Sequence, residues 1–411
     1  MIRIISEEEA PTVLGRSVDR VGEAMGVSAP IVADVRLRGD EALKEYRQRF
    51  DLVALDEPLY LDAGGELEAD LQQAVEQASR NIQSFAEAQL VTSWMSEFSD
   101  GRSLGQLVRP LNSVGVYVPA GRYPLISTLL MAVIPAQVAG VPNIVVACPH
   151  PSREILAVAK MLGVKQILHA GGAQAIAAMA YGTESVKPVQ CIVGPGNAYV
   201  AAAKKLVSQD VAIDFVAGPS EILIVASQGN VQWIAADMLA QAEHDVDARA
   251  ILLTTDKEFA LRVQAEIEIQ LSSLSTVQIA QRAIIDNSAI VVCDTTDSAF
   301  NLVNTIAPEH LSVEQKSDIE RVNSAGSIFV GQYSTEAAGD YASGPNHILP
   351  TSGNAAVRGG LSVNDFVKVI TVQELSKTAL RELEPAVTAL ARAEGLEAHA
   401  RSVETRNDAT A

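Results

Sequence analysis

The sequence predicts an α/β fold in which parallel sheets are covered by helices on both faces. From Val108 onward, short β-branched runs alternate with Ala- and Leu-rich stretches of helical character, and this alternation is typical of parallel sheets. The strand runs are continuously apolar, as expected when both faces of a sheet are buried. The chain has 411 residues, and at about 150 residues per domain that is room for two or three domains.

The elements follow from local patterns taken in chain order. In the N-terminal part, 69–88 has long apolar and charged residues without Pro or Gly, and 51–62 contains a short extended piece bounded by Pro58. The β-branched runs predict strands at 114–118, 144–147, 166–169, 191–193, 222–226, 250–254, 289–293 and 327–330. Helices are predicted at 127–139, 152–161, 173–180, 197–208, 231–243, 257–273 and 386–403. The Gly-, Ser- and Asn-rich stretch 334–360 has little periodicity, and long irregular stretches are usually functional or disordered.

The composition argues against several classes of protein. The chain has 31 Lys and Arg against 50 Asp and Glu, a formal net charge of −19, which repels nucleic acid. No apolar run reaches the ~18 to 20 residues of a membrane helix, and no segment of signal-peptide length is recognised near Met1. The sparse cysteines Cys148, Cys191 and Cys293 indicate buried free thiols in a reducing compartment. We therefore expect a cytoplasmic protein without nucleic-acid or membrane partners.

Glycine-rich turns in the middle of the chain allow two interpretations. The turns at 118–121, 169–172 and 194–197 each follow a predicted strand, so they lie where open α/β sheets bind ligands. The turn at 217–220 instead leads into a strand. None of them completes the G-x-G-x-x-G pattern, and a Walker-type G-K-[ST] is missing as well. They are either plain strand-to-helix connections or the cradle of a dinucleotide.

Four of the six histidines stand in segments that also carry acidic residues: His244, His310, His347 and His399. Imidazole and carboxylate are ligands of zinc and the usual general acids and bases. Gln241 and His244 are three residues apart, so on a helix they share a face and can present two ligands to one metal. A cationic His at a helix C-terminus explains the same spacing equally well.

The adjacent pair Glu309–His310 is a candidate catalytic couple. Neighbouring residues on a regular element point apart, so we expect the pair on a loop or at a helix start after Pro308. Neutral His is a good proton acceptor near pH 7, and a partly buried Glu can activate water. A helix N-terminus with a dipole-matched Glu is the competing explanation.

Taken together, these motifs resemble the histidinol dehydrogenase family over about residues 38–406. The matching segments share their order along the chain with that family. They are V114-GVYVP, A170-GGAQAIA, V193-GPGNAYV, A217-GPSE, A240-QAEHD, A307-PEHL, A338-GDYASG, N346-HILPT and E394-GLEAH. Any one segment is weak evidence for the resemblance, whereas nine segments in the same order are highly specific evidence.

The resemblance implies a particular domain arrangement and assembly. Two domains with incomplete Rossmann-like parallel sheets are expected, with helical N-terminal and C-terminal extensions that pack on a dimer partner. The expected boundaries are 1–14 for the N-terminal extension, 15–116 with 222–363 for the first α/β domain, 117–221 for the second, NAD-binding domain, and 364–411 for a C-terminal tail exchanged between subunits. His399 and Glu394 then serve the partner's site in a homodimer with shared active sites.

The resemblance also implies the cofactors and the site residues. The expected reaction is the oxidation of L-histidinol to L-histidine by way of the aldehyde, with two NAD, one water and one Zn²⁺ per subunit. Catalysis is assigned to Glu309 and His310. Zinc is assigned to Gln241, His244, Asp340 and His399. Substrate contacts are assigned to Ser220, Gln241, His244, Glu309, Asp340, His347, Glu394 and His399. NAD contacts are assigned to Tyr117, Gln174 and Asn197.

The chain departs from the family pattern in two places. After Tyr117 the turn reads Pro119-Ala120-Gly121, where the family usually has two glycines, and Ala120 restricts positive φ in the cofactor loop. The segment 351–358 lacks the aromatic residue common near its end. Two competing functions remain at this point: a related enzyme that oxidises another small alcohol with NAD, and a zinc-binding interaction protein without catalysis.

The chemistry of histidinol suggests a separate role for the zinc ion, for His310 and for Glu309. Histidinol offers an imidazole and an amine, which are good zinc ligands, so zinc is expected to anchor and orient the substrate. His310 is expected to accept the alcohol proton in the first oxidation and a hydrate proton in the second. Glu309 is expected to activate the water that attacks the aldehyde between them.

Overall fold

The computed structural model describes residues 1–14, 20–119, 125–216 and 218–408. These residues form two compact units, which are treated separately here. The first unit comprises Met1–Gln89 and Leu111–Phe366, and the second comprises Leu90–Pro110 and Val367–Ala411. No helix in the described part of the chain is long and apolar enough to span a membrane.

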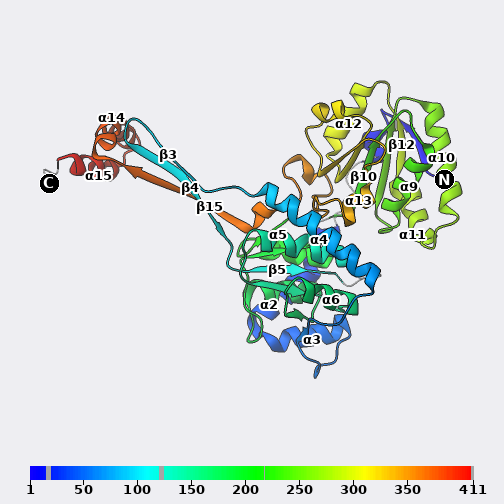
Figure 1. Cartoon of the computed structure of the whole chain (residues 1–411), viewed down its shortest axis with the longest axis horizontal. Coiled ribbons are helices and arrows are strands. Elements are labelled where there is room, and N and C mark those ends of the chain that lie inside the picture. The colour runs from blue at the N-terminus through cyan, green and yellow to red at the C-terminus, as the bar shows by residue number, and fades with distance from the viewer. Residues whose placement is uncertain (15–19, 120–124, 217, 409–411) are drawn as a thin grey trace. The chain divides into compact units, whose positions relative to one another are not determined.

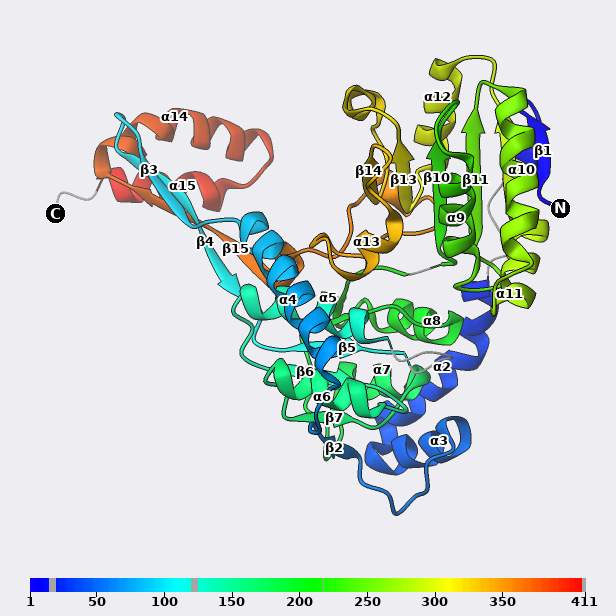
Figure 2. The same cartoon turned by 45° about the vertical axis from the view of Figure 1, so that its right-hand side comes forward.

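The first unit contains a six-stranded parallel sheet with the order β1-β12-β11-β10-β13-β14. Its strands are β1 (Arg3–Ser6), β10 (Glu221–Val225), β11 (Arg249–Thr254), β12 (Ala289–Val292), β13 (His310–Val313) and β14 (Ser327–Val330). The connecting helices are α9 (Val231–Ala242), α10 (Lys257–Leu271), α11 (Val277–Arg282) and α12 (Thr296–Ile306). Figure 2 shows α9 and α10 lying along β10 and β11.

Both faces of this sheet are buried, which explains the continuously apolar strand sequences. Ile222 and Ile224 of β10 belong to one core cluster, whereas Leu223 between them belongs to a second cluster. Successive side chains of a strand point to opposite faces, so the two clusters lie on the two sides of the sheet. The predicted α/β class with covered parallel sheets is confirmed.

The same unit contains a second six-stranded sheet with the order β2-β7-β6-β5-β8-β9. Its strands are β2 (Tyr60–Asp62), β5 (Val114–Tyr117), β6 (Ile144–Ala147), β7 (Gln166–Leu168), β8 (Cys191–Val193) and β9 (Ala212–Ile213). Only β2 pairs antiparallel, with β7. Its helices include α2 (Arg20–Arg38), α3 (Asp40–Asp51), α4 (Ala69–Gln89), α5 (Ile126–Val138), α6 (Arg153–Met161), α7 (Gly172–Tyr181) and α8 (Ala198–Val207).

The two sheets repeat one topology. From β10 the chain proceeds to β11 and β12 on one side and returns to β13 and β14 on the other. From β5 it proceeds in the same way to β6 and β7, and then to β8 and β9. Each sheet therefore contains a 3-2-1-4-5 order, five strands of the Rossmann pattern, and a point where the strand order reverses. The repeat exists in the fold without a recognisable repeat in the sequence.

The second unit is built on an antiparallel sheet in the order β15-β4-β3, followed by two helices. Its elements are β3 (Trp94–Glu97), β4 (Arg102–Pro110), β15 (Val367–Leu375), α14 (Lys377–Ala393) and α15 (Glu397–Asp408), and Figure 1 shows the three strands side by side. The expectation of one helix at 386–403 is wrong, because the chain turns at Gly395 with φ of +76°. The expected helical tail is also incomplete, because its first residues form β15.

The structure groups the N-terminal residues differently from the expected domains. Residues 1–14 do not form a purely helical extension, because β1 pairs in parallel with β12, ahead of the short helix α1 (Ala10–Val13). The helices within 15–116 do not join the first sheet, since Ile31 and Leu43 are part of the core of the second sheet. β5 starts before residue 117 and belongs to that second sheet too.

Candidate functional site

The expected catalytic pair lies at the amino end of β13, an inner strand of the first sheet. His310 is the first residue of β13, and Glu309 precedes it directly. The expectation of a loop holds for Glu309, which lies in the bend before the strand, but it is wrong for His310, which pairs in register with Ile222 of β10. Both side chains are buried, with 4% of each residue exposed. His310 Nδ1 lies 3.8 Å from Glu309 Oε2, so the two groups meet although they are adjacent in sequence.

Glu309 is buried beside His310 and close to other acidic side chains. Its Oε2 accepts a hydrogen bond of 2.9 Å from the backbone N–H of Glu221. Burial raises the pKa of Glu309 well above its usual range, and the nearby carboxylates of Glu221 and Asp340 raise it further. A carboxylate whose pKa is raised in this way is a stronger base, so it can take a proton from water and hold it.

His310 is held in one tautomer by the backbone. Its Nδ1 lies 3.2 Å from the carbonyl oxygen of Glu221, so Nδ1–H donates there and Nε2 carries the free lone pair. Burial lowers the pKa of His310 to about 3, which keeps the imidazole neutral at physiological pH. Nε2 is buried without a hydrogen-bond partner among the described residues and lies 3.7 Å from Asp340 Oδ1. Nε2 is therefore the ring nitrogen of His310 that can accept a proton.

Three of the four expected zinc ligands lie in the first unit. Asp340 is on the short helix α13 (Glu336–Tyr341), and its Oδ2 is 3.9 Å from His244 Nε2. His244 follows the C-cap of α9 and is half-exposed. Burial raises the pKa of Asp340 to about 7. The structure thus brings His244, His310 and Asp340 together from separate parts of the chain.

Gln241 provides the test of whether these residues fit a metal. It lies in the last turn of α9 and is 1% exposed. Neither Oε1 nor Nε2 of its amide has a hydrogen-bond partner among the residues that the structure describes. Buried polar groups are nearly always paired, so an unpaired amide three residues before His244 fits a place among the ligands of a metal. The donor set of amide oxygen, imidazole and carboxylate suits a divalent cation such as zinc.

Glu336 is a member of the cluster that the sequence reasoning missed. It opens α13 and is 4% exposed, and its Oε1 lies 3.5 Å from His310 Nδ1. His310, Glu336 and Asp340 offer ligand atoms that lie within 4.8 Å of one another. The available signal was the spacing of four between Glu336 and Asp340, which places both on one helix face.

The remaining expected substrate contacts are divided between the two units. His347 Nδ1 donates to the backbone carbonyl of Asp340 over 2.6 Å, so it supports the helix that carries Asp340. Ser220 directly precedes β10, and its carbonyl accepts from the N–H of Arg249. Glu394 and His399 lie in the second unit, where both are exposed, and their part in the site stays a prediction.

The expected NAD contacts gather at the carboxyl ends of strands in the second sheet. Tyr117 ends β5, and its Oη accepts from the N–H of Gly172. Gln174 on α7 is buried and donates from Nε2 to Asp51 over 3.2 Å. Asn197 is exposed and caps α8 by accepting from two backbone N–H groups. Tyr117 and Asn197 flank the β5/β8 reversal of strand order, the usual ligand position in such sheets, whereas Gln174 follows β7. Ala120 lies outside the described residues.

A buried ion pair holds the turn that follows β8. Lys204 of α8 is paired with Asp214 in the interior, and Lys204 Nζ also donates to the carbonyl of Gly194 over 2.9 Å. Asp214 accepts from the N–H of Gly194. Gly194 has φ of +112°, and a Cβ there would clash with the Tyr117 carbonyl. Glycine is therefore required at this close approach of two backbones.

Comparison with known proteins identifies the family. The histidinol dehydrogenase family model matches residues 15–407. The histidinol dehydrogenases of Geobacillus kaustophilus and Halalkalibacterium halodurans are 48% and 47% identical over 92% of this chain and 92% of their own lengths. A crystal structure of histidinol dehydrogenase from Elizabethkingia anophelis superposes with a TM-score of 0.94 at 36% identity and covers 98% of both chains. The chain belongs to the histidinol dehydrogenase family.

Proposed function

We propose that the chain oxidises L-histidinol to L-histidine in two consecutive steps at one site, with NAD as the oxidant in each. Overall, the alcohol, one water and two NAD⁺ give the carboxylate, two NADH and three protons. Family membership supports the substrate and the oxidant. The observation that carries the mechanism is a neutral His310, with its free lone pair on Nε2, beside the buried carboxyl of Glu309.

His310 acts as the base in both oxidations. Its Nε2 takes the hydroxyl proton of the alcohol, and later a hydroxyl proton of the aldehyde hydrate. The Glu221 carbonyl keeps the accepting nitrogen fixed, since it holds the proton of Nδ1 over 3.2 Å. A neutral imidazole is available across the physiological range, because burial lowers the pKa of His310 to about 3.

Glu309 acts between the two oxidations. It removes a proton from the water that adds to the aldehyde carbon, and its carboxyl group holds that proton in the buried site. The raised pKa of Glu309 makes it a stronger base than an exposed carboxylate. Two neighbouring bases for two different protons explain why an acid and an imidazole stand together.

The metal and the cofactor are assigned to residues of this chain. Gln241, His244, Asp340 and His399 hold Zn²⁺, one ion per subunit, which supplies a fixed anchor for the imidazole and amine of the substrate. Tyr117, Gln174 and Asn197 contact NAD, which supplies the hydride acceptor. Ser220, His347 and Glu394 complete the substrate contacts beside the catalytic pair and the zinc ligands.

The assembly proposed with this function is a homodimer in the cytoplasm. The C-terminal residues 364–411 cross to the partner, and so His399 and Glu394 serve the partner's site. Two features support this: both residues are exposed, and they belong to a compact unit of their own that does not contain the catalytic pair. In the proposed division into domains, residues 222–363 carry the catalytic pair and residues 117–221 bind NAD.

The variant Glu309→Gln tests the assignment of the two bases. We expect it to slow oxidation of supplied histidinaldehyde by about 100-fold or more, in the range of general acid–base catalysis, while the first oxidation of histidinol changes much less. Both rates come from the same preparation by NADH absorbance, so the alcohol step is the internal control. Equal losses in both steps contradict the role given to Glu309.

A further inference from the structure

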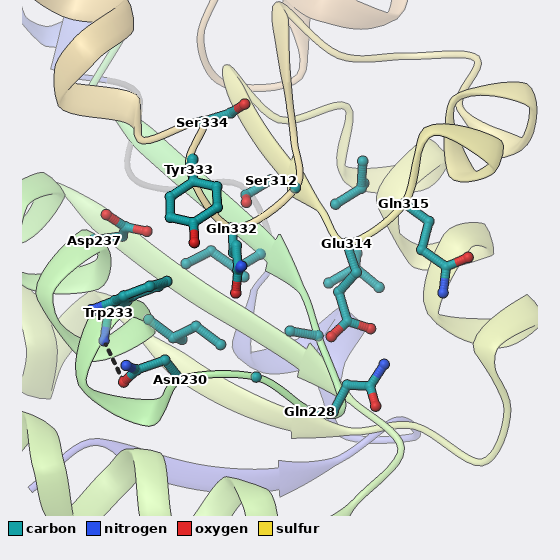
Figure 3. A pocket seen from close by; sticks show the side chains of 17 residues that line it. Gln228, Asn230, Trp233, Asp237, Ser312, Glu314, Gln315, Gln332, Tyr333 and Ser334 are labelled. Atoms are coloured by element: carbon teal, nitrogen blue, oxygen red, sulfur yellow. Dashed lines mark hydrogen bonds between the residues drawn. The ribbon is translucent and has the colours of Figure 1, made fainter.

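A cavity of about 610 Å³ lies at the carboxyl ends of β10 and β13. Figure 3 shows side chains from α9, from the end of β13 and from the loop after β14 around it. Its volume falls within the ~300–1,000 Å³ typical of small-molecule sites. Glu309 and His310 lie at the opposite, amino end of β13 and are not among the residues that line the cavity.

The position of the cavity is the one where such sheets bind ligands. The strand order of the first sheet reverses between β10 and β13, and open α/β sheets bind ligands outside the carboxyl ends of strands at this reversal. The second sheet has the same topology, and its equivalent position lies between β5 and β8. The cavity is thus the counterpart, in the first sheet, of the position assigned to NAD in the second.

The charges around the cavity disfavour a phosphate group. Asp237 and Glu314 line it, and its described lining contains no Lys, Arg or His. The N-terminus of α9, where a phosphate would otherwise bind, is closed by its own cap, because Asn230 Oδ1 accepts from the N–H groups of Gln232 and Trp233. A nucleotide is therefore a poor match, and a cation is a good one.

Aromatic surface and a free carboxylate lie close together on one wall. The rings of Trp233 and Tyr333 have centroids 5.8 Å apart with a tilt of 48°, and Figure 3 shows Asp237 beside Tyr333. None of the described residues pairs with the Asp237 carboxylate. A planar ring can pack on the aromatic pair while a positive group meets the carboxylate, and aromatic faces attract cations as well.

We infer that this cavity is a second ligand site, and that it binds a small aromatic amine in its cationic form. The ring of the amine packs against Trp233 and Tyr333, and its ammonium group donates hydrogen bonds to Asp237. Glu314 adds negative potential from the β13 side. No bond is made or broken, so the site is one of binding.

A set of three probes of similar shape and different charge tests this inference. The probes are 2-phenylethylamine, 2-phenylethanol and 3-phenylpropionate, which are cationic, neutral and anionic. The chain has two Trp residues, Trp94 and Trp233. In a Trp94→Phe background, fluorescence excited at the long-wavelength edge of the Trp absorption band therefore reports on Trp233. We expect saturable quenching by the amine, with an affinity about ten-fold or more above that of the alcohol, since hydrogen bonds to a charged group are the strong ones. We expect no binding of the carboxylate.

Variants of the same background assign the binding to the cavity. Asp237→Asn and Glu314→Gln are each expected to lower the affinity for the amine about ten-fold. The effect of Asp237→Asn should be at least as large as that of Glu314→Gln. Glu320→Gln removes one negative charge from an exposed position and is the matched control, expected to bind as the background does. Equal binding of all three probes overturns the inference, and so does amine binding that survives both cavity variants. The probe series on the unaltered cavity keeps the test valid if a variant does not fold.

Discussion

Replacing Gln241 by Met should stabilise the metal-free protein, although most substitutions of buried residues do the opposite. Gln241 is 1% exposed, and both polar atoms of its amide lack a partner among the described residues. Met has a similar unbranched length and helix propensity, so the change removes two unpaired polar atoms while it keeps the packing.

The magnitude follows from the cost of buried, unpaired polar groups. Leaving a buried donor or acceptor unsatisfied costs about 1–3 kcal/mol. We therefore expect the free energy of unfolding of metal-free Gln241→Met to exceed that of the unaltered protein by about 1–3 kcal/mol. With zinc present the order should reverse, because a ligand that binds only the folded state stabilises it by RT ln(1 + [L]/Kd) and the variant has lost a ligand atom.

Chemical denaturation after chelation, repeated with added zinc, measures both effects. Gln174→Met is the matched control, since Gln174 is also 1% exposed but donates to the Asp51 carboxylate over 3.2 Å. It should lose about 1.5–3 kcal/mol of stability, the value of a hydrogen bond to a charged group. If metal-free Gln241→Met is destabilised like the control, or if it keeps the full response to zinc, the reasoning about Gln241 is refuted.

Three further results are expected. His244→Asn should lose zinc and activity together, and a zinc-replete but inactive variant would count against ligation. Hybrid dimers that combine His399→Asn subunits with His310→Asn subunits should recover part of the activity that each parent homodimer lacks; well-formed hybrids without recovery would contradict a shared site. Lys204→Met should lower the free energy of unfolding by about 3–5 kcal/mol because it leaves a buried carboxylate unpaired, and an unchanged denaturation midpoint would show that the Asp214 charge is compensated elsewhere.

The sequence predicted the parallel sheets well, for a physical reason. Strands buried on both faces have short, continuously apolar runs, and the predicted strands 191–193, 250–254 and 289–293 agree with β8, β11 and β12 to within one residue at each end. β13 was missed because its four residues start with His310 and contain Ser312, so no apolar run marks it. Its strand conformation comes from pairing with β10 and β14.

The antiparallel unit was missed because its strands are not buried on both faces. β3 is exposed along its length, and β15 is exposed at most positions. Such strands carry mixed polar and apolar residues, and only their cross-strand register, Val367 opposite Pro110 through Leu375 opposite Arg102, makes them a sheet. Positions so far apart in sequence cannot be paired from local patterns.

The candidate site was predictable in part. The spacing of Gln241 and His244 fits either a metal site or a helix C-terminus, and the adjacency of Glu309 and His310 fits either a catalytic pair or a helix N-terminus. The family resemblance favoured the metal site and the catalytic pair. The contact between His244 and Asp340 depends on where α9 and α13 lie in the fold, which no spacing reveals. Glu336 carried a usable signal in its helical spacing to Asp340.

The stoichiometry of NADH formation tests the central claim most directly. Purified protein is mixed with limiting L-histidinol and excess NAD, and the total NADH absorbance at completion is divided by the histidinol consumed. The account predicts two NADH for each histidinol, with histidine as the product. One NADH for each histidinol, with the aldehyde accumulating, would contradict the two-step mechanism, and the absence of NADH formation would contradict the proposed activity.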